Sequence, residues 1–244
     1  SACAVFYDLD DPNKFLKDIS RLLDKDEGIF YLEFQDLLSI IKFNLFDTIC
    51  HEHLEYYSLN VVKEMVERNN MKVIDVIQND INGGSLGIFI SHINSKYKKI
   101  NKNINQILLE EKKFKINRKS TFKNFYNKIK ILKRKLLLLL KKAKKEKKSI
   151  HGYGASTKGN VLLQFFGINQ HYIDCIADRN PEKNNLFTPG TKLKIISENR
   201  SRKLNPEYYL VLPWHFKKEI LIREKKIIKK GTKFIFPLPN IEII

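Results

Sequence analysis

The first 95 residues alternate between short apolar runs and segments whose apolar positions recur every three or four residues. The short runs predict strands over residues 3–7, 29–34, 71–77 and 86–93. Helical spacing predicts a first helix opened by Asp11 and Pro12, and a short second helix over 36–43. A third helix is expected over 61–69, with Ser58 as its N-cap. The predicted order is therefore β-α-β-α-β-β.

The turn signal Asn82-Gly83-Gly84 separates the last two apolar runs. Such a turn joins consecutive strands as antiparallel neighbours, which is our expectation here. The run 29–34 is bounded by Gly28 and is apolar over most of its length, which is typical of a central parallel strand.

Residues 97–148 contain no glycine or proline, and their apolar positions recur at helical intervals among Lys, Asn and Glu. This pattern predicts two helices with a break near Asn117. We expect the pair to bridge two domains as a folded segment rather than as a flexible linker.

A second α/β pattern follows, beginning with a strand from Ser149 that enters a glycine turn. It continues with a helix over 156–166, a strand over 172–177, a loop over 180–191, a strand over 208–212, a helix over 216–229 and a strand over 233–237. Strands that alternate with helices indicate a parallel sheet. The sequence thus predicts the α/β class, with a first domain over 1–96, a helical bridge over 97–148 and a second α/β domain over 149–244.

Composition is consistent with a globular chain, because 43% of the 244 residues are hydrophobic. The chain opens at Ser1 on an apolar run without a signal peptide, so we expect it to begin inside a domain. Three scattered cysteines without C-x-x-C spacing argue against a disulfide framework and a cysteine zinc site, and favour a cytoplasmic location. The longest apolar run, 136–140, is too short for a membrane span.

A net charge of +18 raises nucleic acid or an anionic surface as partners, because Lys and Arg patches bind phosphate chains. The positive charge is spread along the chain with one concentration between Lys112 and Lys148, and Asn and Ile are abundant as well. Composition bias with a solvated helix face is therefore favoured over a nucleic-acid site. A non-catalytic nucleotide- or polyanion-binding protein is kept as the alternative function.

The glycine turn Gly152-Tyr153-Gly154-Ala155 with Lys158-Gly159-Asn160 resembles a strand-turn-helix that offers backbone N–H groups to phosphate. Asp178 follows the next predicted strand, where a ribose-binding acid stands in dinucleotide folds. The spacing departs from G-x-G-x-x-G and from a P-loop, and close strand-helix packing explains glycines here as well as ligand binding does.

The segment Cys50-His51-Glu52-His53 has three interpretations. His51 and His53 share one face of an extended segment, as metal ligands do, but no third ligand is evident nearby. A local hydrogen-bond network at a loop is a second interpretation, because buried polar groups must pair. General acid/base chemistry is the third, because His exchanges a proton near neutral pH.

Several spaced motifs together resemble one known family. They are Phe46-Asp47-Thr48-Ile49-Cys50-His51-Glu52-His53, Tyr57-Ser58-Leu59, Asn82-Gly83-Gly84-Ser85, Gly152-Tyr153-Gly154-Ala155 with Lys158-Gly159-Asn160, Asp178-Arg179-Asn180-Pro181, Pro189-Gly190-Thr191 and Leu212-Pro213-Trp214. In this order they resemble the S-adenosylmethionine-dependent C-methyltransferases that act on nucleotide-diphosphate deoxysugars. The resemblance runs through nearly the whole chain.

The resemblance implies a zinc-binding N-terminal domain, a middle Rossmann-like class I methyltransferase domain, and a C-terminal Rossmann-like domain that helps to hold the nucleotide-sugar. The zinc cysteines and the glycine-rich loop for S-adenosylmethionine are absent from this sequence. We therefore expect a fragment of a longer protein. Residues 1–96 of the fragment would be the C-terminal half of the methyltransferase domain, and the fragment would be inactive by itself. Zinc and the cofactor loop would lie upstream.

The resemblance also implies site residues. His53 is expected as the base that removes a proton beside a ketone, Glu52 as its partner, and His51 and Tyr56 as further members of the catalytic group. Residues expected to bind the substrate are Asn82, Gly83, Gly84, Gly152, Tyr153, Gly154, Ala155, Lys158, Asn160, Asp178 and Trp214. No residue is assigned to a metal.

Two positions depart from the family pattern. Cys50 stands where many relatives have Tyr, so no phenol is available there to donate to an enolate oxygen. Asp8 stands where many relatives have His. We expect Tyr56 or Tyr57 to act as the substitute donor.

Overall fold

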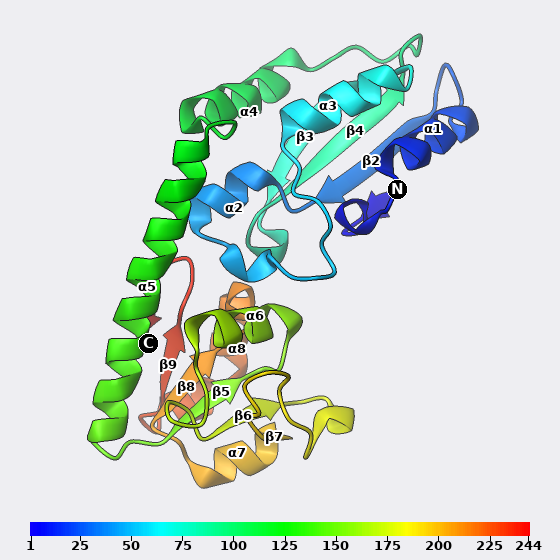
Figure 1. The fold of residues 1–244 in the computed structure, drawn as a ribbon. Helices are drawn as coiled ribbons and strands as arrows, with labels where there is room; N and C mark the ends of the chain where they lie inside the picture. Colours follow the sequence, from blue (N-terminus) through cyan, green and yellow to red (C-terminus); the bar gives the residue numbers. More distant parts are fainter. The chain divides into compact units, whose positions relative to one another are not determined.

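A computed structural model describes all residues, 1–244, and divides the chain into two compact units (Figure 1). The first unit contains residues 1–43 and 51–125. The second contains residues 126–244 together with the short segment 44–50. Both units are of the α/β class, and each is described by itself.

The first unit is built on a four-stranded mixed sheet with the strand order β1-β2-β4-β3. Its elements are β1 (Ala2–Cys3), α1 (Pro12–Leu22), β2 (Ile29–Phe34), α2 (Leu37–Phe43), α3 (Leu59–Arg68), β3 (Met71–Asn79), β4 (Ser85–His92) and α4 (Asn101–Phe114). The hairpin of β3 and β4 is antiparallel, as the Asn82-Gly83-Gly84 turn predicts. Leu32, Ile88 and Ile90 are fully buried in the core of the first unit.

The predicted helix starts are confirmed in this unit. The Asp11 carboxylate accepts the Lys14 backbone N–H at 2.9 Å, and the Ser58 hydroxyl accepts the Val61 N–H at 3.4 Å. Each side chain satisfies one of the backbone donors that a helix leaves unpaired at its N-terminus.

Two strand predictions need correction. Residues 3–7 are not a buried strand, because Ala4 adopts a left-handed φ of 55° and the chain then forms a 3₁₀ turn over Phe6–Asp8. Cys3 is exposed, whereas Phe6 enters the core. Strand β2 is parallel only to the short β1, and it pairs with β4 in the antiparallel sense.

Glu111 of α4 provides a second cap for α3. Its carboxylate accepts the backbone N–H groups of Leu59 at 2.6 Å and Asn60 at 3.2 Å. Burial raises the pKa of Glu111 to about 7, against the effect of the two N–H donors, and nearby Asp36 raises it further. Folding therefore favours the protonated form of this carboxyl group.

We expect Glu111 to make the first unit less stable as the pH rises. Its folded-state pKa lies above the ordinary 4.5, so its stabilising contribution is complete below pH 4.5 and is lost as the pH approaches 7. The loss is about 3 kcal/mol at most. Urea unfolding at pH 5 and pH 8 should show a weaker pH dependence for Glu111→Gln than for the unmodified protein.

The matched control is Glu110→Gln on the same helix, which removes a carboxylate that pairs with Lys42 at 2.9 Å near the surface. It should leave the pH dependence of the unfolding free energy as it was. An unchanged pH dependence in Glu111→Gln would contradict this assignment.

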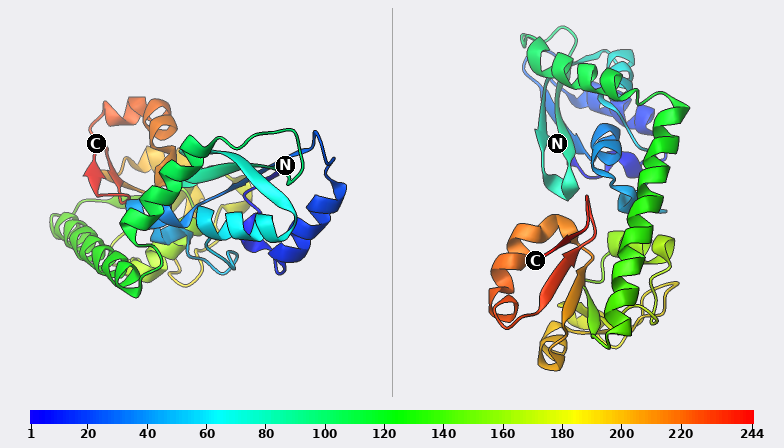
Figure 2. Two further views of the ribbon diagram at one scale, coloured as in Figure 1. Left: turned by 90° about the horizontal axis from the view of Figure 1, so that it is seen from above. Right: turned by 90° about the vertical axis from the view of Figure 1, so that its left-hand side faces the viewer.

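The second unit contains a six-stranded sheet with the order β10-β9-β8-β5-β6-β7. Its elements are β5 (Ile150–Tyr153), α6 (Thr157–Phe166), β6 (Cys175–Asp178), β7 (Ile195–Ser197), α7 (Glu198–Leu204), β8 (Tyr208–Val211), α8 (Lys217–Arg223), α9 (Lys225–Ile228), β9 (Lys233–Phe236) and β10 (Glu242–Ile243). All pairings are parallel except that of β10 with β9. Figure 2 shows the C-terminus beside β9 at this edge.

The predicted parallel sheet is confirmed, with two differences in detail. Strand β7 and helix α7 lie where no element was predicted, since both are too short to show a periodic pattern. The position of β7 is set by its pairing with β6. The predicted helix over 216–229 is split into α8 and α9, and Glu224 lies between them.

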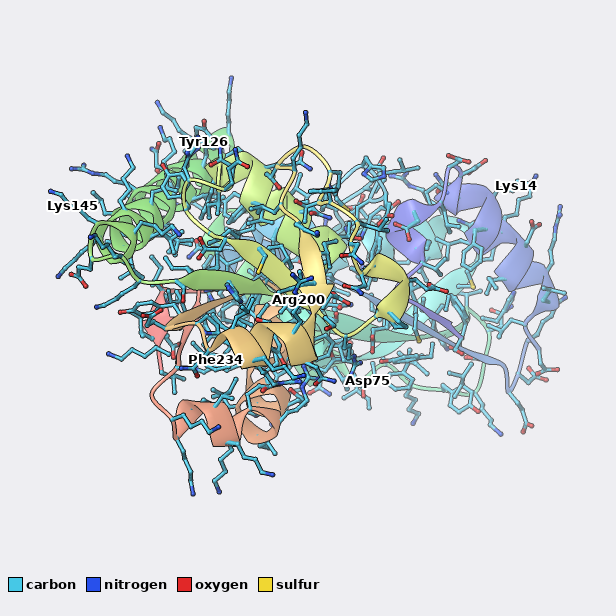
Figure 3. The ribbon with its side chains drawn as sticks, turned by 90° about the horizontal axis from the view of Figure 1, so that it is seen from below. Lys14, Asp75, Tyr126, Lys145, Arg200 and Phe234 are labelled. Carbon is cyan, nitrogen blue, oxygen red and sulfur yellow. The ribbon has the colours of Figure 1, made fainter.

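Helix α5 (Lys119–Lys145) carries 11 of the chain's 45 Lys and Arg residues. Predicted helices over 97–148 are confirmed, because α4 ends at Phe114 and α5 begins beyond Asn117. A buried stripe recurs at helical spacing in α5, formed by Ile129, Leu132, Leu136, Leu140 and Ala143. Side chains fan out from the helix between the labelled Tyr126 and Lys145 (Figure 3).

No helix combines the length and apolarity that crossing a membrane requires.

Candidate functional site

The His51–Tyr56 segment of the first unit is an exposed turn followed by extended chain. His51 and Glu52 are exposed, whereas His53 and Tyr56 are half-buried. The His53 ring lies 4.4 Å from the Tyr7 ring and 6.4 Å from the Tyr56 ring, measured between centroids. Among the predicted catalytic residues, the structure therefore brings His53 and Tyr56 together.

The backbone of Tyr7 fixes the segment just after His53. Its carbonyl oxygen accepts the N–H groups of Leu54 at 2.9 Å and Glu55 at 3.2 Å. The 3₁₀ turn that contains Tyr7 also contains Asp8, whose pKa is raised by partial burial. The charge of His53 lowers the Asp8 pKa and that of Glu52 raises it, so these groups share one electrostatic environment.

Tyr57 has a different environment from Tyr56. Its ring packs on Phe6 at 4.9 Å in the core, and its hydroxyl is buried without a hydrogen-bond partner. Burial raises its pKa to about 12. Of the two phenols that were considered as substitute donors, only Tyr56 lies beside His53.

The predicted substrate residues Asn82, Gly83 and Gly84 form the β3–β4 turn. All three have positive φ, and the Asn82 carbonyl accepts the Gln35 side-chain N–H at 3.1 Å. A Cβ atom at Gly84 would lie 2.9 Å from the Ser39 Cβ. The turn is thus held against the start of α2.

A pocket of about 510 Å³ lies in the second unit at the ends of β5 and β6. Four of the predicted substrate residues line it: Tyr153, Gly154, Ala155 and Asp178. The Asp178 carboxylate accepts the backbone N–H groups of Ala155 at 2.6 Å and Asn180 at 2.8 Å. Asp178, the last residue of β6, therefore joins the loops that follow the two strands.

Packing restricts both glycines of this turn. Gly152 lies within β5, and a Cβ atom there would meet the Ile176 Cδ1 at 2.3 Å. Gly154 has a φ of +83°, and a Cβ atom would meet the Pro213 Cδ at 2.7 Å. Close packing thus explains both positions, whether or not a ligand approaches the turn.

Several charged residues in this pocket have no role predicted from the sequence. They are Arg179, Lys183, Glu198, Glu219 and Arg223. Arg179 lies within a motif of the resemblance, but Arg223 lies in a helix that showed no functional signal. The Arg223 guanidinium donates to the Tyr153 hydroxyl at 2.5 Å, and that hydroxyl donates to buried Glu224 at 2.6 Å.

Lys158 and Trp214 belong to a different cluster in the same unit. The Trp214 Nε1–H donates to Asp47 Oδ2 at 2.7 Å. Burial raises the pKa of Asp47, and the charge of Lys158 opposes that shift. Burial lowers the pKa of Lys158, while Asp47 and Cys50 raise it. The predicted residue Asn160 lies on α6 with its side-chain oxygen buried and unpaired.

No group of three or more His, Cys, Asp or Glu side chains is arranged to hold a metal ion. Geometry therefore offers two candidate regions: the His53 region in the first unit, and in the second unit the pocket with the adjoining Asp47 cluster.

Two comparisons with known proteins bear on these regions. The sequence model of one protein family, described as the C-methyltransferase C-terminal domain, matches residues 80–239. The chain is also 30% identical over 239 residues to the C-methyltransferase NovU of Streptomyces niveus. That alignment covers 98% of this chain, including the His51–Tyr56 segment, and 56% of the relative, so the chain spans about half the length of the relative. The chain belongs to the C-methyltransferase family.

Proposed function

We propose that the protein takes part in transferring a methyl group from S-adenosylmethionine to a carbon beside a ketone in a nucleotide-diphosphate deoxysugar. The observation that carries this proposal is the half-buried His53 beside Tyr56, on a chain of the C-methyltransferase family. An sp³ carbon beside a ketone is not nucleophilic until a base removes its proton. A half-buried imidazole can take up a proton near neutral pH, which suits it to act as this base.

In the proposed reaction, His53 takes the proton from the carbon beside the ketone, and the C–H electron pair becomes the enolate. Glu52 acts as its partner or as a second proton carrier. S-adenosylmethionine would supply the electrophilic methyl group, and no residue of this chain is assigned to hold it. The enolate carbon then forms the new C–C bond as the bond from sulfur to methyl breaks, and the ketone is restored.

Tyr56 is proposed to donate a hydrogen bond to the enolate oxygen. Cys50 cannot supply a phenol, and the Tyr57 hydroxyl lies in the core. A donor aimed at the developing negative charge stabilises the transition state more than the ground state.

The pocket of the second unit is proposed to hold the nucleotide-sugar. Arg179 and Lys183 line it and could meet the charge of the phosphates, although Glu198 and Glu219 also line it. Asp178 lies at the end of β6. Ligands of open parallel sheets bind outside the carboxyl ends of the strands, which supports this assignment.

Replacing Asp178 with Ala should weaken binding of the nucleotide-sugar. The backbone N–H groups of Ala155 and Asn180 would lose the carboxylate that accepts their hydrogen bonds. Hydrogen bonds to a charged group each stabilise a fold by about 1.5–3 kcal/mol, so the loops that line the pocket would be held less firmly. We expect the KM for the sugar to rise by about tenfold or more, while the KM for S-adenosylmethionine stays unchanged. Equal KM values for the sugar in both proteins would contradict the assignment.

The proposed function is tested with the full-length protein and S-adenosylmethionine labelled in its methyl group. We expect label in a 4-keto nucleotide-sugar and none in the same sugar with its ketone reduced to an alcohol, because the alcohol cannot form an enolate. Equal labelling of both sugars would contradict the enolate step. Absence of label from every keto sugar tested would contradict the function.

A further inference from the structure

A groove of about 520 Å³ lies in the second unit along one face of α5. Its lining extends from Tyr126 to Lys141 of this helix and includes Phe165 of α6. The lining positions of α5 follow the three- and four-residue spacing of a single helix face. Along the helix axis, the distance from Tyr126 to Lys141 is about 22 Å. We call this feature the α5 groove, and all of its lining residues belong to the second unit.

The α5 groove is positively charged, and no carboxylate lines it. Its cations are Lys130, Lys133, Arg134 and Lys141. Helix α5 contains no Asp or Glu that could neutralise them. Lys130 and Arg134 lie four positions apart, and like charges at that spacing destabilise a helix. A bound anionic partner would remove this repulsion, so the charge favours such a partner.

The α5 groove also exposes apolar surface. Leu138 is 58% exposed, Tyr126 50% and Phe165 42%. The Lys130 ammonium lies 4.8 Å from the Tyr126 ring centroid, and the Lys133 ammonium lies 5.7 Å from that of Phe165. Apolar surface rimmed by polar groups is typical of interaction sites. A partner that fits this groove therefore has an apolar side as well as negative charge.

Three kinds of anionic partner differ in how they use these features. A single-stranded nucleic acid stacks its bases on aromatic rings, but Lys130 and Lys133 already lie over the two rings of the groove. A lipid surface takes up apolar groups that protrude, whereas Leu138 and its neighbours line a hollow. An amphipathic helix inserts its apolar side chains into a groove and presents its polar flanks to the rim.

We propose that the α5 groove binds an acidic amphipathic helix of a partner protein. About four turns of such a helix match the length of the groove. Its apolar side chains would pack on Leu138 and Phe165, and carboxylates on its flanks would pair with Lys130, Arg134 and Lys141. This interaction is independent of the proposed role of the protein in methyl transfer.

The test measures the binding of a synthetic peptide to the full-length protein by fluorescence anisotropy. The peptide has about 15 residues, with Leu at helical spacing on one face and Glu on both flanks. Combining Lys130→Gln, Arg134→Gln and Lys141→Gln should weaken binding about tenfold or more, because three ion pairs of the strength usual at protein surfaces are lost. Leu138→Ala should also weaken binding, because apolar contact area is lost.

The matched control combines Lys128→Gln, Lys135→Gln and Lys142→Gln. These three residues are exposed on the same helix but do not line the groove, so the control removes the same charge from another face. At physiological ionic strength it should change the affinity by about twofold or less, because charges outside the groove are screened from the peptide. A peptide of the same composition in scrambled order should bind about tenfold more weakly, because its apolar side chains no longer share one face.

Three results would overturn the proposal. Equal weakening by the two triple substitutions would mean that only the net charge of α5 attracts the peptide. Equal binding of the scrambled peptide would mean that the apolar part of the groove has no role. Tighter binding of single-stranded RNA, or of phosphatidylglycerol vesicles, than of the peptide would assign the groove to another class of partner.

Discussion

Replacing His53 with Asn should reduce methyl transfer by the full-length protein about 10²- to 10⁴-fold, the usual contribution of a general base. Asn is similar in size and polarity but cannot accept the proton. His53 is half-buried and its ring contacts Tyr7, so the substitution removes few buried contacts and the fold should persist.

Solvent exchange gives a second measure of the same variant. In D₂O and without S-adenosylmethionine, we expect the unmodified protein to exchange the proton beside the ketone, and His53→Asn not to do so. His171→Asn, at an exposed loop position of the second unit, is the control and should retain both activities. Full methyl transfer by His53→Asn would exclude this residue as the base.

Replacing Gly152 with Ala should destabilise the second unit by about 1–3 kcal/mol, the usual cost of overfilling a packed core. The new methyl group would lie 2.3 Å from the Ile176 Cδ1 on the neighbouring strand β6. Chemical denaturation followed by circular dichroism measures this loss.

A second substitution tests whether that contact is the cause. Ile176→Val removes the carbon that the new methyl group meets, and alone it should cost about 0.5–1.5 kcal/mol. Combined with Gly152→Ala, it should destabilise the protein by clearly less than the sum of the two single changes. Additive effects would mean that the strain in Gly152→Ala arises elsewhere.

The sequence predicted the elements that have local causes. Helices α1 and α3 begin at Asp11 and Ser58, whose side chains cap them, and the β3–β4 hairpin turns at residues with positive φ. Strand β7 was missed because three residues are too few to show a period. The expected strand over 3–7 failed at Ala4, whose left-handed conformation has no signal in the sequence.

The candidate site was predictable only where one motif holds its residues together. His53 and Tyr56 lie three residues apart, and Gly154 and Ala155 are adjacent. Asp47 and Trp214 are 167 residues apart, and no periodicity or cap relates them. Their hydrogen bond depends on the packing of α6 and β8, which only the fold determines.

The attachment point of the transferred methyl group tests the central proposal most directly. The full-length protein would be incubated with a 4-keto nucleotide-sugar and S-adenosylmethionine that carries ¹³C in its methyl group, and the product examined by NMR. We predict a new methyl signal coupled to the ring carbon beside the ketone. A methyl group bonded to oxygen, or no labelled sugar at all, would contradict the account.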